Sequence, residues 1–183
     1  MSTNLTVGIV GYGFVGGAVA YGFNTPGVKQ FIADPKLGSS LDDIPNNVNV
    51  IFVCVPTPMN EDFSIDSSIV EKTVAELLEK TEHCPIVIKS TVTPDKLRKI
   101  RSLRVVYNPE FLTEKNANED FINPKMHVFG GDRGVTAQLE HIYDQYSLCR
   151  PCPIFHMTMT EASLVKYGIN SFLATKVLWF NQF

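Results

Sequence analysis

The chain has 183 residues and a formal net charge of −3, with 44% hydrophobic and 19% charged residues. A chain of this length buries roughly 70% of the surface that its unfolded form exposes, which allows one well-formed core. The composition is that of a globular protein and not of a disordered chain. The sequence has no strongly basic stretch, so we expect no nucleic acid partner.

The apolar segments are too short for a membrane protein. No apolar run reaches the roughly 18 residues that a transmembrane helix needs. Met1–Asn4 lacks the charged segment and the following apolar segment of a signal peptide. We therefore predict a cytoplasmic location and no membrane partner.

A first strand is expected over Leu5–Val10, and it leads directly into a glycine motif and a helix pattern over Val15–Phe23. The Gly-x-Gly-x-x-Gly motif consists of Gly11, Tyr12, Gly13, Phe14, Val15 and Gly16. In dinucleotide-binding folds the first glycine makes a tight turn, the second lets the backbone approach a pyrophosphate, and the third allows close helix–strand packing. The N-terminus of the helix then offers N–H groups to the phosphates.

A second strand is expected over Val28–Ala33 and ends at Asp34. This carboxylate follows the glycines by roughly 20 residues, where it can accept hydrogen bonds from the ribose hydroxyls of adenosine. It would repel a 2′-phosphate, so NAD is favoured over NADP. Alternatively, Asp34 only starts a turn before Pro35, since Asp-Pro sequences favour turns.

Strands and helices continue to alternate along the chain. Further strands are expected over Val50–Val55, Ile86–Ser90, Val105–Tyr107, Met126–Gly130 and Ile154–His156. Further helices are expected over Ser67–Thr81, Pro94–Ile100 and Gly134–Tyr146. Continuous apolar strands separated by helices indicate βαβ units whose sheet is covered on both faces. We therefore predict an α/β fold with a doubly wound, Rossmann-type parallel sheet. The polar stretch Asn108–Lys125 has no clear period and is expected to be a functional loop.

The last segment is predicted to be one long C-terminal helix. Thr158–Glu161 has the spacing of a capping box, and the helix pattern continues to Phe183 with only Gly168 in its way. The end, Val177–Phe183, is apolar on several sides and should pack against something beyond its own domain. We predict an NAD-binding domain over residues 1–157 and the start of an interdomain or dimerisation helix over residues 158–183.

The four cysteines give no clear functional signal. Cys54 and Cys84 lie in or beside predicted strands and are expected to be small buried apolar residues. Cys149 and Cys152 form a C-x-x-C motif, which can be a redox pair or half of a zinc site. The motif precedes a strand instead of opening a helix, and no second ligand pair is present. We expect no metal site.

Four segments fall where a doubly wound fold binds ligands, at the carboxyl ends of strands or beside them. They are Val55–Pro58, Ser90–Val92, Asn108–Glu114 and the helical pair Lys166 and Asn170. Lys166 and Asn170 share one helix face and could donate hydrogen bonds to a developing oxyanion. By spacing alone, a solvated lysine beside a neutral polar residue is the simpler explanation of this pair.

Taken in order, these motifs resemble the UDP-glucose/GDP-mannose dehydrogenase family. The likeness runs from the glycine loop to the last residue and includes Asn108–Leu112. In the last helix it rests on Glu161, Lys166, Tyr167, Asn170, Leu173, Ala174 and Lys176. The resemblance implies an NAD-dependent enzyme that oxidises the C6 alcohol of a nucleotide sugar to a carboxylate in two hydride transfers. UDP-glucose is the expected substrate.

The resemblance also implies roles for the matching residues. Contacts with NAD are implied for Gly11, Tyr12, Gly13, Phe14, Val15, Gly16, Asp34, Val55, Pro56, Thr57, Ser90, Thr91 and Glu114. The nucleotide-sugar site is implied for Glu110, Phe111, Leu112, Thr113, Glu114, Lys166 and Asn170. Glu110 would be the general base, Lys166 and Asn170 would stabilise oxyanions, and Thr91 would help to hold a catalytic water.

One departure limits what the resemblance implies. The family's nucleophilic cysteine belongs to a glycine-rich segment in a second domain, and none of the four cysteines here has that context. We therefore expect an NAD-binding half without the C-terminal substrate domain, with little or no turnover of UDP-glucose by this chain alone. The partner is then a second copy joined through the last helix, or a separate chain with the cysteine domain.

Two other functions remain open from the sequence. One is a non-catalytic NAD-binding module, which the missing cysteine favours. The other is a β-hydroxyacid dehydrogenase-like enzyme, which would share the glycine loop and the helical Lys-(x3)-Asn pair. The Val55–Pro58 and Asn108–Leu112 motifs argue against this second alternative.

Overall fold

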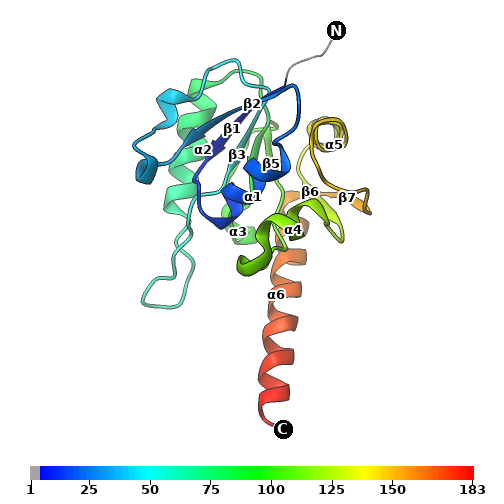
Figure 1. Ribbon diagram of the computed structural model, residues 1–183. Helices are drawn as coiled ribbons and strands as arrows, with labels where there is room; N and C mark the ends of the chain where they lie inside the picture. Colours follow the sequence, from blue (N-terminus) through cyan, green and yellow to red (C-terminus); the bar gives the residue numbers. More distant parts are fainter. Residues whose placement is uncertain (1–4) are drawn as a thin grey trace.

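The computed structural model describes residues 5–183 as a seven-stranded sheet with helices on both faces (Figure 1). The strands are β1 (Leu5–Val10), β2 (Val28–Ala33), β3 (Val50–Val53), β4 (Ile86–Ile88), β5 (Val105–Tyr107), β6 (His127–Gly130) and β7 (Ile154–Met157). Their order across the sheet is β2-β1-β3-β4-β5-β6-β7. The segment Met1–Asn4, where we expected no signal peptide, lies outside the described residues.

The prediction of a doubly wound Rossmann-type sheet is confirmed, except that the last two strands run opposite to the other five. Strands β1 to β5 are parallel, whereas β6 pairs antiparallel with β5 through Tyr107 and Gly130, and β7 pairs parallel with β6. The only helix longer than one turn between these two strands is α4 (Ala117–Ile122), whose 6 residues span about 9 Å. This helix is too short to return the chain to the amino ends of the strands, so β6 enters from the carboxyl side.

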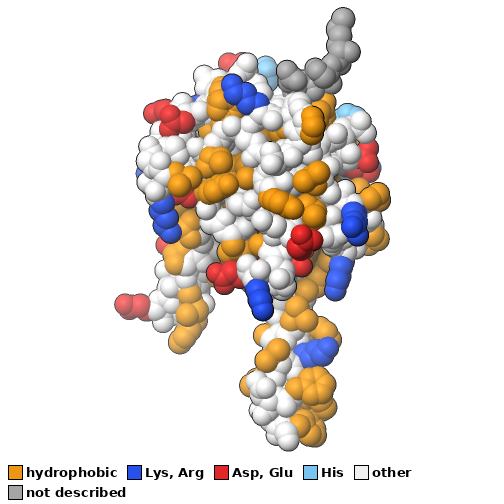
Figure 2. Space-filling view, viewed as in Figure 1, with side chains coloured by type: hydrophobic (Ala, Val, Ile, Leu, Met, Phe, Trp, Pro, Cys, Tyr) orange, Lys and Arg blue, Asp and Glu red, His pale blue; other side chains and the backbone are white. Residues whose placement is uncertain are grey.

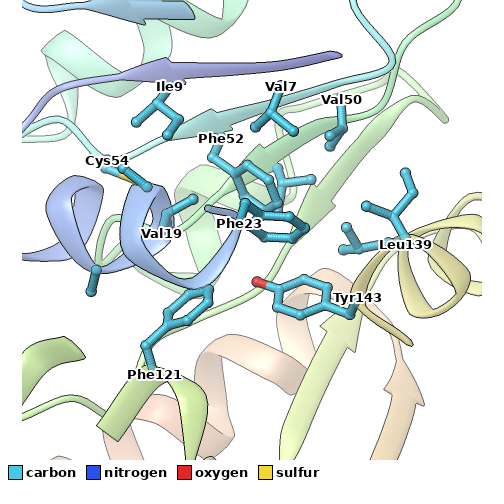
Figure 3. Packing of buried hydrophobic residues seen from close by; sticks show 14 of the residues in the cluster. Val7, Ile9, Val19, Phe23, Val50, Phe52, Cys54, Phe121, Leu139 and Tyr143 are labelled. Carbon is cyan, nitrogen blue, oxygen red and sulfur yellow. The ribbon is translucent and has the colours of Figure 1, made fainter. Parts of the chain in front are cut away.

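Alternate residues of each strand face two different helical layers. One layer comprises α1 (Phe14–Gly22), α4 and α5 (Arg133–Tyr146), and the other comprises α2 (Ser68–Lys80), α3 (Pro94–Leu97) and α6 (Met159–Asn181). In β3, Phe52 packs in the first layer while Ile51 and Val53 pack in the second. Figure 3 shows Phe52 in the first layer beside Phe23 and Tyr143. Burial on both faces explains the continuous apolar strands.

The prediction of an irregular loop over Asn108–Lys125 is wrong in part. The segment contains a short 3-10 helix, Glu114–Asn116, followed by α4. Helix α4 packs on α1 so closely that a Cβ at Gly22 would lie 2.1 Å from the Phe121 ring. Its stability comes from this tertiary contact, so local periodicity gave no signal. Two other 3-10 helices cover Pro35–Leu37 and Leu41–Asp43. Helix α3 ends at Leu97, three residues before the predicted end.

The long C-terminal helix is confirmed, as is its capping box. The Thr158 side chain accepts a hydrogen bond from the Glu161 N–H, and Glu161 accepts one from the Thr158 N–H. The second half of α6 leaves the domain (Figure 1) and carries exposed apolar side chains (Figure 2). They include Phe172, Leu173, Val177, Leu178, Trp179, Phe180 and Phe183. Within residues 5–183, no helix has both the length and the apolarity needed to cross a membrane.

Candidate functional site

The glycine loop lies at the topological switch point, between the carboxyl ends of β1 and β3. Gly11 has a φ of +87°, and a Cβ there would lie 2.7 Å from the Cys54 carbonyl oxygen. A Cβ at Gly16 would lie 1.9 Å from the Gly11 carbonyl oxygen. The packing of the chain against itself therefore requires glycine at both positions.

Gly13 is different, because the protein itself gives no steric reason for a glycine there. A Cβ at Gly13 would meet no atom within 4 Å. The residue also precedes the first turn of α1, whose N-terminus has no side-chain cap and no acidic residue. Open space above Gly13 and uncapped N–H groups are what a bound pyrophosphate requires, so the loop fits a dinucleotide.

Asp34 lies beside this loop at the end of β2 and is 9% exposed. Its Oδ2 accepts a hydrogen bond of 2.6 Å from the Tyr12 N–H, and its Oδ1 accepts one of 2.8 Å from the Lys36 N–H. These two backbone hydrogen bonds lower the pKa of the Asp34 carboxyl group, and the one from Tyr12 has the larger effect. The turn role is confirmed, since Asp34 caps the Pro35–Leu37 helix. A carboxylate oxygen accepts more than one hydrogen bond, so the ribose role is compatible with this geometry.

The ends of β3 and β4 are joined by Ser90. Its hydroxyl donates a hydrogen bond of 2.6 Å to the Val55 carbonyl oxygen, which holds the Val55–Thr57 and Ser90–Thr91 segments side by side. Thr57 and Thr91 are half-buried, and Pro56 is exposed. Within residues 5–183, the structure shows no hydrogen bond of the Thr57 or Thr91 hydroxyl. Both hydroxyls are therefore available to a ligand.

Glu110 and Lys166 form the buried ion pair of this edge of the sheet. The Lys166 Nζ donates to the Glu110 Oε1 at 2.9 Å and also to the Glu110 carbonyl oxygen. The two side chains are 5% and 11% exposed, for Lys166 and Glu110 respectively. The Glu110 Oε2 accepts a hydrogen bond of 2.7 Å from the Leu112 N–H, and the Lys166 ammonium lies 5.4 Å from the centre of the Phe111 ring.

This pair has the donors and acceptors that proton-transfer chemistry on an alcohol needs. An ammonium has three N–H donors, and Lys166 uses two of them on Glu110. One donor remains for a ligand oxygen. An ionised carboxylate that contacts an ammonium can take up a proton from a neighbouring hydroxyl while the cation stabilises the resulting oxyanion.

Other predicted site residues are less closely associated with this pair. Asn170 is exposed and follows Lys166 by one helical turn of α6, so the two residues share a helix face; within residues 5–183 the Asn170 side chain makes no hydrogen bond. The N–H and the hydroxyl of Thr113 both donate hydrogen bonds to the Oδ2 of Asp120. Glu114 is exposed in the 3-10 helix, and Phe111 and Leu112 are half-buried.

A buried polar network that the sequence did not reveal lies behind the site. Lys89 is 4% exposed, and its Nζ donates a hydrogen bond of 3.0 Å to the Asn108 Oδ1. The Tyr143 hydroxyl donates to the same oxygen at 2.9 Å, and the Asn108 Nδ2 donates to the Val128 carbonyl oxygen at 3.0 Å. Burial lowers the pKa of Lys89 to about 8. The signal for this network in the sequence was a lysine within the otherwise apolar strand segment Ile86–Ser90, since lysines are rarely buried.

Cys54 and Cys84 agree with their predicted role as small buried residues. Cys54 and Cys84 are buried, and all four thiols are free. Burial raises the pKa of Cys54 to about 12 and also raises the pKa values of Cys149 and Cys152. Such thiols hold little thiolate and react slowly. Across residues 5–183, no group of three or more histidine, cysteine or carboxylate side chains is placed to bind a metal ion.

The chain is similar to known proteins in both sequence and fold. Residues 28–147 match the model of the NAD binding domain of the UDP-glucose/GDP-mannose dehydrogenase family. A UDP-glucose 6-dehydrogenase of Rickettsia bellii is 34% identical over 157 residues, which are 80% of this chain and 36% of that protein. A UDP-glucose dehydrogenase structure from Pyrobaculum islandicum has a TM-score of 0.83 at 26% identity, over 99% of this chain and 52% of that one.

A ternary complex of a GDP-mannose dehydrogenase from Pseudomonas aeruginosa has a TM-score of 0.80 at 25% identity. The match covers 96% of this chain and 51% of that chain. This chain thus spans about half the length of these solved structures and about a third of the Rickettsia protein.

Proposed function

Because this chain belongs to the UDP-glucose/GDP-mannose dehydrogenase family, we propose that it supplies the NAD site and the proton-transfer residues of a nucleotide-sugar 6-dehydrogenase. UDP-glucose is the proposed substrate. The observation that carries the proposal is the buried Glu110–Lys166 pair, which lies at the same carboxyl edge of the sheet as the glycine loop. A cofactor site without such a pair would support dinucleotide binding only.

The strand order supports a direction for the cofactor along the sheet. Asp34 follows β2, the glycine loop follows β1, the Val55–Thr57 segment follows β3 and the Ser90–Thr91 segment follows β4. With the adenosine ribose at Asp34 and the pyrophosphate at the glycine loop, the nicotinamide half extends toward β3 and β4. We also propose that Glu114 contacts the bound NAD.

The proposed chemistry starts with the alcohol of the nucleotide sugar at Glu110. Glu110 accepts the hydroxyl proton, and the free donor of Lys166 stabilises the developing oxyanion, with Asn170 as a second donor. Bound NAD would accept the hydride. Phe111, Leu112 and Thr113 line the sugar-nucleotide side, and Thr91 helps to hold a water for the second oxidation.

A non-catalytic NAD-binding module is the second candidate, and the thiols favour it. The Cys54, Cys149 and Cys152 thiols have raised pKa values, and Cys84 is buried. The three thiols with raised pKa values hold little of the thiolate that a covalent aldehyde-to-acid oxidation needs, and burial keeps Cys84 away from a substrate. For the dehydrogenase, the first candidate, we propose instead that a cysteine-bearing segment outside these residues completes the reaction.

The exposed apolar half of α6 supports a proposal about partners. We propose that a second copy of the chain, or a separate chain with the cysteine domain, covers this surface in a cytoplasmic enzyme. Analytical ultracentrifugation of the chain alone and with Leu178→Lys distinguishes self-association from a monomer.

Calorimetry with NAD and an NADH-production assay with UDP-glucose test the proposed function. We expect NAD binding with little or no NADH produced by the 183-residue chain alone. Robust formation of the uronic acid would contradict the need for a further cysteine-bearing segment. No affinity for NAD would contradict both candidate functions.

A further inference from the structure

Lys89 is the one part of the buried network that carries a charge and lies next to a proposed cofactor segment. It directly follows β4 and precedes Ser90 and Thr91. Its backbone N–H is bound to the Val53 carbonyl oxygen at 2.9 Å, which fixes it between the ends of β3 and β4. The ammonium lies 5.8 Å from the centre of the Phe121 ring and is shielded from water.

Within the described part of the chain, no carboxylate forms an ion pair with Lys89. Among residues 5–183, the hydrogen-bond acceptor of its Nζ is the neutral amide oxygen of Asn108, and no ion pair includes it. The nearby Glu110 carboxylate is already matched by Lys166 at 2.9 Å. With these three groups ionised, the ends of β4 and β5 hold a net charge of +1. A buried, uncompensated charge costs folding free energy, so its presence suggests a role beyond packing.

We propose that the buried ammonium of Lys89 is an electrostatic determinant of the nicotinamide site, which weakens the binding of NAD⁺ relative to NADH. The inference rests on the proposed function, because that function directs the nicotinamide half toward β3 and β4. The nicotinamide ring of NAD⁺ carries a positive charge, whereas the ring of NADH is neutral. A fixed cation behind this part of the site therefore repels the oxidised form selectively.

The pH dependence of this preference follows from the groups around Lys89. Burial is the main reason for its lowered pKa of about 8. The titratable groups that face it from the neighbouring strands and helices are Cys54, His127, Tyr143, Cys149, Glu110 and Lys166. Cys54, Cys149 and Tyr143 have raised pKa values and His127 has a pKa lowered to about 4, so these four are neutral near pH 8. Lys89, in contrast to these four groups, is expected to change its charge there.

The test compares two substitutions that remove a donor from the same oxygen. Lys89→Met removes the hydrogen bond to the Asn108 Oδ1 and the charge. Tyr143→Phe removes the other hydrogen bond to that oxygen and no charge. Dissociation constants for NAD⁺ and NADH are measured by calorimetry for the unmodified chain and both variants at pH 7. The pH dependence of their ratio in the unmodified chain, from pH 6.5 to 9.5, is a second measurement that needs no variant.

We expect Lys89→Met to lower the ratio of the NAD⁺ and NADH dissociation constants about tenfold, which corresponds to two charges roughly 12 Å apart at an effective dielectric constant of about 20. Tyr143→Phe is expected to leave the ratio unchanged. In the unmodified chain the ratio should fall with rising pH, with a midpoint near the Lys89 pKa of about 8. Equal shifts in both variants, or a ratio independent of pH, would overturn the inference while leaving the proposed function intact. No binding of either cofactor form would overturn both.

Discussion

At the carboxyl edge of the sheet, the half of the site at β1 and β2 differs in its chemical groups from the half at β4 and β5. At β1 and β2, the site consists of glycines, free N–H groups and one carboxylate held by backbone donors. At β4 and β5, it consists of buried charged side chains, in the Glu110–Lys166 pair and the Lys89–Asn108 hydrogen bond. Backbone conformation defines the first half. Contacts of buried charged side chains with residues far away in the sequence define the second half. Mutations should therefore act through steric contacts in one half and through electrostatics in the other.

The largest expected effect is in the backbone-built half. Gly16→Ala places a methyl group where the Gly11 carbonyl oxygen lies, because the Cβ would be 1.9 Å from it. We expect the free energy of unfolding to fall by at least about 4 kcal/mol, with loss of measurable NAD binding. Chemical denaturation and calorimetry measure the two quantities.

Gly13→Ala is the matched control for Gly16→Ala. Its Cβ meets no protein atom within 4 Å, so we expect stability to change by less than about 1 kcal/mol. NAD affinity should still fall by about tenfold or more, because the methyl group occupies the space of the pyrophosphate. Unchanged NAD affinity in Gly13→Ala would show that the cofactor does not approach this backbone.

In the charge-built half, Glu110→Gln leaves the Lys166 ammonium buried without its carboxylate. We expect the free energy of unfolding to fall by about 3 kcal/mol, as for other broken buried ion pairs. The control is Glu76→Gln, which breaks the Lys72–Glu76 pair on the surface, with side chains 80% and 49% exposed. This control should change stability little. Equal effects of the two substitutions would mean that the Glu110–Lys166 pair is solvated in solution.

The pH dependence of stability isolates the Lys89 charge. Burial lowers the Lys89 pKa from 10.5 to about 8 in the folded chain. Between these values the unfolded chain still holds a proton that the folded chain has released, so Lys89 makes the free energy of unfolding rise with pH. At about 1.4 kcal/mol per pKa unit, its contribution approaches about 3 kcal/mol. The difference between the unmodified chain and Lys89→Met, measured by denaturation from pH 7 to 10.5, should change by this amount.

Taking the difference between the two proteins removes the contributions of tyrosines and cysteines with raised pKa values, such as Tyr107. The free energy of unfolding of Lys89→Met, relative to that of the unmodified chain, should be highest below pH 8, because the substitution removes a buried charge there. A difference that is constant across this pH range would show that Lys89 has an ordinary pKa in the folded state.

The smallest expected effect is at Asp34, the charged side chain in the half of the site at β1 and β2. Asp34→Asn keeps one acceptor oxygen for the Tyr12 and Lys36 N–H groups and replaces the other with an NH₂ group. We expect NAD affinity to fall by about tenfold, which is about 1.4 kcal/mol, and the preference for NAD over NADP to narrow. Calorimetry with both dinucleotides measures this. An unchanged preference would leave Asp34 with its turn role alone.

The sequence by itself determined the backbone-built half of the site and the order of the strands and helices along the chain. The glycine spacing, the apolar strands and the Thr158–Glu161 capping box are local signals, because a turn, a strand or a helix start depends on neighbouring residues. The seven strands were found with small differences at their ends. Glu110 and Lys166 were named from the resemblance, but nothing local indicated that they contact each other.

Only the tertiary structure decided the reversed direction of β6 and β7, helix α4 and the charged network. Helix α4 depends on Phe121 packing against Gly22, and Lys89 meets Asn108 from an adjacent strand. The Glu110–Lys166 pair joins residues 56 positions apart in the sequence. Burial and pairing of charges depend on which segments meet in space, so periodicity and spacing along the chain do not reveal them.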